Sequence, residues 1–148
     1  EALGHLGQSA LLAEVFNRVE GDAPPVDLVA EKKHGEFILE NAAWVTACTD
    51  ISDGGLALAA FEMAEEACVG VSLDSEDTAE LFGEDQARYL VACNFDQAEA
   101  LMAAAGKSGV PVACVGSFGG TQVRFGSSQA ELAELSKIFR SSFAAAVT

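Results

Sequence analysis

A strand-to-helix junction in the first half of the chain decides the predicted fold: Thr49-Asp50-Ile51-Ser52-Asp53-Gly54-Gly55-Leu56. The apolar run before it, residues 42–48, predicts a buried strand, and residues 56–64 after it have the periodicity of a helix. Glycines allow backbone conformations that other residues resist, and the free amides of a helix start can meet an anion or orient a carboxylate. The junction is therefore a candidate ligand site. Alternatively, Ser52 or Asp53 is only an N-cap and the glycines only form a turn, and the local pattern leaves both interpretations open.

Helices and strands alternate on both sides of this junction. Upstream, apolar spacing predicts a helix from Leu6 to Phe16 and a second helix capped by Asp27. Downstream, we expect an exposed acid-rich connection over residues 74–80 and a hairpin at Gly119-Gly120. The remaining expected elements are strands at residues 68–73, 88–93 and 110–115, a helix over residues 96–105, and a final helix from about Ser128.

The order of these elements predicts the fold class. From the first strand onward it is strand, helix, strand, strand, helix, strand, the split βαβ order of ferredoxin-like sheets, followed by an added strand and helix. We expect a single α+β domain over residues 1–148, with layered α/β/α architecture and a mixed sheet. Because such folds host unrelated activities, the chemistry has to be argued from particular residues.

Composition excludes several classes of function. Among 148 residues, acids outnumber Lys and Arg 23 to 8, so the chain lacks the basic surface that nucleic-acid binding requires. The four cysteines form no Cys-x-x-Cys pair, which argues against a zinc site and favours small buried thiols. No apolar run reaches the length of a membrane span, and we expect a cytoplasmic protein with no membrane partner. The chain begins at Glu1 within a helical pattern, which suggests a piece of a longer protein.

A second polar cluster, Leu81-Phe82-Gly83-Glu84-Asp85-Gln86-Ala87-Arg88, directly precedes the strand that starts near Tyr89. Glu84 or Asp85 could ligate a hard cation, Gln86 could bond an amide or a sugar, and Arg88 could hold a phosphate. The alternative is a solvated loop in which Arg88 pairs with a nearby acid.

The other polar residues carry less information. Ser9, with the backbone of Gly4 and Gly7, could touch a phosphate at the start of the first helix, or could simply cap that helix. His5 and His34 lie near no Cys or Ser motif, and no nucleophile–base arrangement is visible.

Taken together, four ordered motifs resemble the C-terminal domain of the large-subunit (PurL) family of phosphoribosylformylglycinamidine synthases, in the aminoimidazole ribonucleotide (AIR) synthetase superfamily. The resemblance spans nearly the whole chain. It rests on the two motifs quoted above and on Gly4-His5-Leu6-Gly7-Gln8-Ser9 and Pro24-Pro25-Val26-Asp27-Leu28, which open the two upstream helices. It implies the AIR synthetase C-terminal-domain fold.

The resemblance also implies an activity: the ATP-dependent conversion of formylglycinamide ribonucleotide and glutamine to formylglycinamidine ribonucleotide in purine biosynthesis. In that family ATP phosphorylates the formamide oxygen and ammonia displaces the phosphate, with charge stabilised by magnesium. The implied partners are the missing N-terminal domains of the same chain, a glutaminase subunit and a small accessory subunit.

By the same resemblance, Asp50 and Gly83 would contact ATP, Glu84 would bind magnesium and Gln86 would bind the ribonucleotide substrate. Further candidates are Asp53, Asp85, Arg88 and Ser9. The chain departs from the family pattern at Thr49, where the family often has histidine, and at Ala87, where it has a small hydroxyl residue or glycine. The family's catalytic histidines lie in N-terminal domains, so no catalytic residue is assigned here and the isolated chain is expected to be folded but inactive.

Two other interpretations remain open. One is a different ATP-using member of the superfamily, such as a selenophosphate synthetase, a thiamine-phosphate kinase or a hydrogenase-maturation enzyme. The other is a non-catalytic interaction module whose apolar face docks on a partner.

Overall fold

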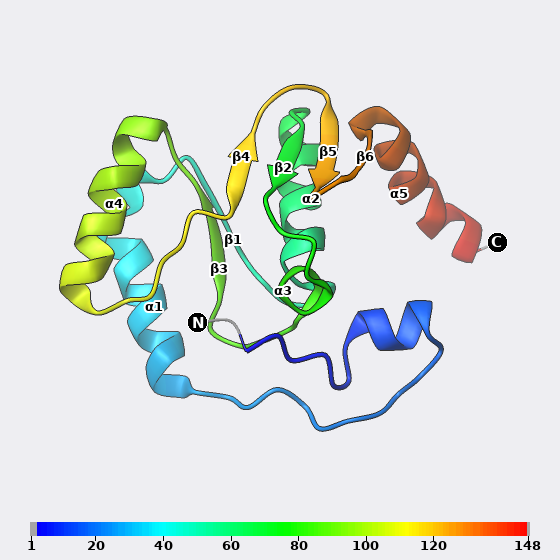
Figure 1. Ribbon diagram of the computed structural model, residues 1–148, viewed down its shortest axis with the longest axis horizontal. Helices are drawn as coiled ribbons and strands as arrows, with labels where there is room; N and C mark the ends of the chain where they lie inside the picture. The colour runs from blue at the N-terminus through cyan, green and yellow to red at the C-terminus, as the bar shows by residue number, and fades with distance from the viewer. Residues whose placement is uncertain (1–2, 148) are drawn as a thin grey trace. The chain divides into compact units, whose positions relative to one another are not determined.

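The computed structural model describes residues 3–147 (Figure 1). Its contacts divide the chain into two compact units, one made of the residues up to Ala59 with Asp77–Cys114, the other of Ala60–Glu76 with the residues from Val115 onward. Each unit is built from two separate stretches of sequence. The expectation of one domain over residues 1–148 stays a prediction.

Two helices and a strand pair form most of the first unit. Helix α1 spans Leu28–Glu40, and its N-cap Asp27 accepts hydrogen bonds from the amides of Val29 and Ala30, as expected. Helix α4 spans Phe95–Ser108 and ends at Gly109, whose φ of 62° suits glycine. The two helices lie together beside the strands (Figure 1), and their contact buries Phe37, Leu101 and Ala105.

Strands β1 (Ala47–Asp50) and β3 (Tyr89–Ala92) pair antiparallel, with Thr49 opposite Leu90 and Asp50 opposite Tyr89. The end of β1 therefore lies beside the start of β3. Because the glycine motif follows β1 and the second polar cluster precedes β3, this register brings both motifs to one end of the strand pair. Just beyond it the amide of Ile51 donates to the carbonyl of Arg88 at 2.9 Å.

The second unit is a four-stranded sheet in the order β4-β2-β5-β6. Its strands are β2 (Val71–Leu73), β4 (Gly116–Phe118), β5 (Gln122–Phe125) and β6 (Ser128–Glu131). Strand β2 is antiparallel to β4 and parallel to β5, and β5 is antiparallel to β6. The expected α+β class with a mixed sheet is confirmed, although the strands divide into two sheets where the element order had suggested one.

Two helices complete this unit. Helix α2 spans Gly55–Ala67, and its second half, from Ala60, belongs here. Helix α5 spans Leu132–Ala146. The rings of Phe61 and Phe139 meet edge to face with centroids 5.3 Å apart, and Arg140 pairs with Glu65 at 2.5 Å.

The predicted hairpin at Gly119-Gly120 is wrong, because β2 lies between β4 and β5. The amide of Gly119 donates to the carbonyl of Gly70 at 2.8 Å, and the amide of Gly70 donates to the carbonyl of Gly120 at 2.9 Å. The glycine pair therefore passes around the start of β2 instead of folding back on itself. The strand β6 was also missed: the final helix starts at Leu132, four residues later than predicted.

Other predicted boundaries shift. The strand expected over residues 42–48 covers Ala47–Asp50, and Ala42–Trp44 form a 3-10 turn (η2). Residues 110–115 are not a strand, and the first helix is reduced to a single π-helical turn, η1, at Leu11–Val15. Within the acid-rich connection lies an unpredicted helix, α3 (Thr78–Phe82), capped by the side chain of Asp77. The thiols of Cys48, Cys68 and Cys114 are exposed, contrary to expectation.

Candidate functional site

An open hollow of about 600 Å³ lies in the first unit, where the two motifs meet. The end of β1 and the residues after it form one wall, from Cys48 to Ser52. The loop before β3 forms another, from Gln86 to Tyr89, and Glu31 of α1 completes the lining. Three predicted site residues, Asp50, Gln86 and Arg88, thus line one hollow although the chain separates the first from the others by more than thirty positions.

Carboxylates dominate one side of the hollow. Burial raises the pKa of the Cys48 thiol, and the charge of the nearby Asp50 raises it further. Burial also raises the pKa of Tyr89, with added contributions from the negative charges of Glu31 and Asp50 and from a hydrogen bond to Glu31. Both groups stay neutral at pH 7 and can offer polar contacts without adding charge.

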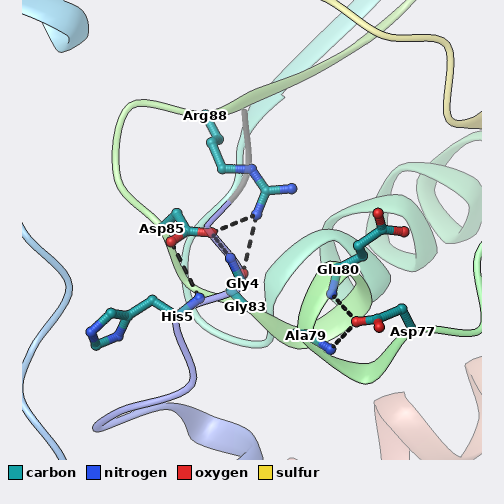
Figure 2. A network of polar contacts seen from close by, with 8 residues as sticks. All are labelled: Gly4, His5, Asp77, Ala79, Glu80, Gly83, Asp85 and Arg88. Atoms are coloured by element: carbon teal, nitrogen blue, oxygen red, sulfur yellow. Dashed lines mark hydrogen bonds and ion pairs between the residues drawn. The ribbon is translucent and has the colours of Figure 1, made fainter.

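Arg88 approaches the hollow from a half-buried position. Its Nη1 donates to the carbonyl of Gly83 at 3.3 Å and lies 3.7 Å from Oδ2 of Asp85 (Figure 2). Burial lowers the pKa of Arg88, while the charges of Asp85 and Glu80 oppose that shift. The guanidinium remains charged at every physiological pH, so it supplies the positive charge among the hollow's acids.

Asp85 is turned inward and binds backbone. Its Oδ2 accepts from the amide of Gly4 at 2.9 Å, and its Oδ1 accepts from the amide of His5 at 3.2 Å (Figure 2). Together with Arg88 it ties the N-terminal segment to the loop before β3. The sequence had allowed an ion pair between Arg88 and a nearby acid, and this pair is present.

Glu84 joins three separate segments. Its Oε1 accepts hydrogen bonds from the amide of Ala10 and the amide of Gly54, both at 2.8 Å, and the residue is only 9% exposed. Its own amide donates to the carbonyl of His5 at 3.0 Å. Oε1 of the predicted magnesium ligand is therefore engaged in holding the glycine motif in place.

Ser9 and Gly83 serve the same packing. Ser9 is 1% exposed, and its Oγ accepts a long hydrogen bond of 3.4 Å from the amide of Leu12, so it caps the short π-helical turn. A side chain at Gly83 would collide with the carbonyl of Ala79 and would come within 3.0 Å of Gly4. Only glycine fits at that position.

The structure thus separates the predicted site residues into two groups. Asp50, Gln86 and Arg88 line the hollow. Asp53 is exposed in the turn after β1 and does not line the hollow. The remaining candidates are buried and brace the loops: Ser9, Gly83, Glu84 and Asp85.

Sequence reasoning missed three residues around the loop. Ala87 has a φ of +60°, a left-handed conformation that costs a non-glycine residue about 1–2 kcal/mol. Its amide donates to Oε1 of Glu31 at 2.8 Å, and its carbonyl lies 2.7 Å from Nδ1 of His34. Glu31 had been interpreted only as a water-facing helix charge and His34 as an isolated histidine. No local pattern connects α1 to a loop more than fifty residues away.

A cluster for a metal ion is not formed by this chain alone. Within residues 3–147 no group of three or more His, Cys, Asp or Glu side chains is arranged to hold one. None of the helices in that range is both long enough and apolar enough to cross a membrane.

Comparison with known proteins agrees with this geometry. A family model described as "AIR synthase related protein, C-terminal domain" matches residues 2–125. The chain belongs to this family. The match includes both motifs that meet at the hollow.

Several curated relatives match almost the whole chain. One, named phosphoribosylformylglycinamidine synthase subunit PurL, from Roseobacter denitrificans, is 68% identical over 147 residues, which are 99% of this chain and 20% of the relative. Another of the same name, from Ruegeria sp., is 69% identical over the same shares. A more distant one from Brucella ovis is 45% identical over 126 residues, 81% of this chain and 17% of the relative. The chain therefore spans about a fifth of the length of these relatives.

Solved structures share the fold at low identity. The structure titled "T. maritima PurL complexed with FGAR" superposes with a TM-score of 0.70 at 20% identity, over 80% of this chain and 23% of that one. "T. maritima PurL complexed with ATP" gives 0.67 at 20% identity, over 89% and 24%. "Structure of PurLQS from Thermotoga maritima" gives 0.67 at 18% identity, over 88% and 24%. These likenesses confirm the expected superfamily fold.

Proposed function

We propose that this chain forms one part of a phosphoribosylformylglycinamidine synthase, which converts formylglycinamide ribonucleotide and glutamine to formylglycinamidine ribonucleotide with ATP in the cytoplasm. The observation that carries the proposal is the 68% identity over 147 residues with a relative of that name. The hollow adds physical support, because it collects the two motifs on which the family resemblance rests.

Within the hollow, we assign ligand contact to the residues that line it. Asp50 faces the nucleotide and Gln86 the ribonucleotide, since their side chains are exposed at its edge. Arg88 supplies a positive charge suited to a phosphate. Gly83 acts through its backbone, where a side chain would not fit.

Magnesium fits this chain less well. Glu84 remains the candidate ligand, but its Oε1 already accepts two backbone amides, and residues 3–147 present no group of three ligands. Asp53, Asp85 and Ser9 stay secondary candidates for the site. We therefore propose that the chain's acids complete a metal site only together with ATP and other parts of the enzyme.

The proposed partners follow from length and from names. The chain spans a fifth of its relatives, so the catalytic steps would require the other domains, and the isolated chain would be inactive. A structural neighbour titled PurLQS supports a larger complex, with a glutaminase and a small accessory subunit as the proposed members.

A chimera tests the proposal. This chain replaces the matching 147 residues of the Roseobacter denitrificans PurL subunit, and the purified protein is assayed with formylglycinamide ribonucleotide, ATP and ammonium. We expect turnover, loss of most of it in Asp50→Asn, and little change in Asp96→Asn, an exposed aspartate of α4 outside the hollow. Turnover by the isolated chain would contradict the proposed division of labour. An inactive, folded chimera would contradict the proposed function.

A further inference from the structure

Glu31 and His34 lie one turn apart on α1 and reach the same peptide segment from two sides. Oε1 of Glu31 accepts from the amide of Ala87 at 2.8 Å, and Nδ1 of His34 lies 2.7 Å from the carbonyl of the same residue. A carbonyl oxygen only accepts, so Nδ1 of His34 carries the proton and donates it. Both hydrogen-bonding groups of Ala87 are thus engaged by side chains of one helix.

Ala87 is the residue of this loop that most needs such support. Its φ of +60° lies in the left-handed region, which alanine adopts rarely. Backbone strain of this kind persists only where surrounding contacts impose it. The residues on either side of Ala87 are Gln86 and Arg88, and both line the hollow.

We propose that Glu31 and His34 are positioning residues that clamp Ala87 in its left-handed conformation and thereby aim Gln86 and Arg88 into the hollow. The two side chains act on the backbone of the loop and need not touch a substrate. The inference rests on the proposed function for the ligand, the ribonucleotide substrate, but the clamp itself is a property of this chain.

Glycine at position 87 separates positioning from a general structural role. Because glycine adopts a positive φ without strain, Ala87→Gly reduces the need for the clamp. In the chimera, Glu31→Ala should raise KM for formylglycinamide ribonucleotide about tenfold, the factor that one lost hydrogen bond to a charged group represents. We expect a much smaller change in kcat. Glu31→Gln, which retains an oxygen acceptor, and the double variant Glu31→Ala/Ala87→Gly should both recover most of the KM.

Lys32→Ala provides the matched control. Lys32 lies next to Glu31 on α1, its side chain is 75% exposed, and its nearest acid is Glu36 at 3.7 Å. Its loss should leave KM unchanged. An equal KM in Glu31→Ala and the parent chimera would overturn the inference, as would a KM defect that Ala87→Gly does not reduce.

Amide exchange tests the clamp without activity. In the 148-residue chain, we expect the Ala87 amide to exchange about tenfold faster in Glu31→Ala than in the parent, whereas Glu31→Gln stays close to it. Unchanged exchange would overturn the clamp. An inactive parent chimera with faster exchange in Glu31→Ala would reject the proposed function and leave the clamp standing. If Glu31→Ala does not fold, His34→Leu tests the other half of the clamp by the KM and rescue measurements.

Discussion

Removing the carboxylate of Glu84 should destabilise the first unit strongly. Oε1 accepts from the amides of Ala10 and Gly54 at 2.8 Å each, and the residue is 9% exposed. A hydrogen bond to a charged group contributes about 1.5–3 kcal/mol, so two such bonds set a range of about 3–6 kcal/mol. Because water can reach part of the emptied space, we expect Glu84→Ala to lose about 3 kcal/mol of unfolding free energy. Glu84→Gln keeps an oxygen acceptor and should lose about half as much.

The assay uses a probe that reports on the right unit. The chain has one tryptophan, Trp44, which lies in the first unit, so its fluorescence follows that unit during urea unfolding. Glu99→Ala, at an exposed site on α4, is the control and should change the free energy by no more than about 0.5 kcal/mol. A loss below about 1 kcal/mol in Glu84→Ala would refute the bracing role. So would an equal loss in Glu84→Ala and Glu84→Gln, because the hydrogen-bond acceptor would then be irrelevant.

Three further changes probe other parts of the structure. Leu101→Ala should cost about 2–5 kcal/mol by the same fluorescence assay, because Leu101 is 4% exposed and packs against Phe37; a cost under about 1 kcal/mol would contradict that packing. Gly55→Ala should destabilise the first unit by at least about 1 kcal/mol, because φ is +66° and the new Cβ would lie 2.8 Å from the backbone of α3; urea midpoints equal to the parent's would contradict it. Glu76 accepts from the amide of Ser127 at 2.7 Å, and hydrogen bonds from that residue lower its pKa. A lowered folded pKa stabilises the fold above the unfolded value of about 4.3, so Glu76→Gln should reduce the thermal midpoint at pH 7. That difference should vanish as the pH falls through the lowered pKa, and a difference that persists in acid would contradict the assignment.

Local sequence patterns predicted the features that depend on nearby residues. Asp27 caps α1, Gly109 ends α4 and the mixed α+β class follows from the succession of apolar runs. The glycine motif and the loop before β3 were both identified as candidate sites from their composition. These signals reside in residues that contact their own sequence neighbours, which makes them readable in one dimension.

Long-range pairing decided what the local patterns could not. The Gly119-Gly120 signal suits a hairpin, yet β2 inserts between β4 and β5 because strand partners are chosen by burial across the whole sheet. Residues 128–131 pair with β5 as a strand despite the helical pattern that follows them. Propensity of a few residues was outweighed by the hydrogen bonds of the sheet edge.

The site shows the same division between sequence and tertiary structure. The sequence by itself determined which segments carry polar chemistry, Thr49 to Leu56 and Leu81 to Arg88. Only the antiparallel register of β1 and β3 brought them to one hollow, and only folding turned Glu84 inward while Asp50 faces outward. A carboxylate's composition is the same in either orientation. Its role depends on which backbone amides lie within hydrogen-bonding distance, and those amides come from segments far apart in the chain.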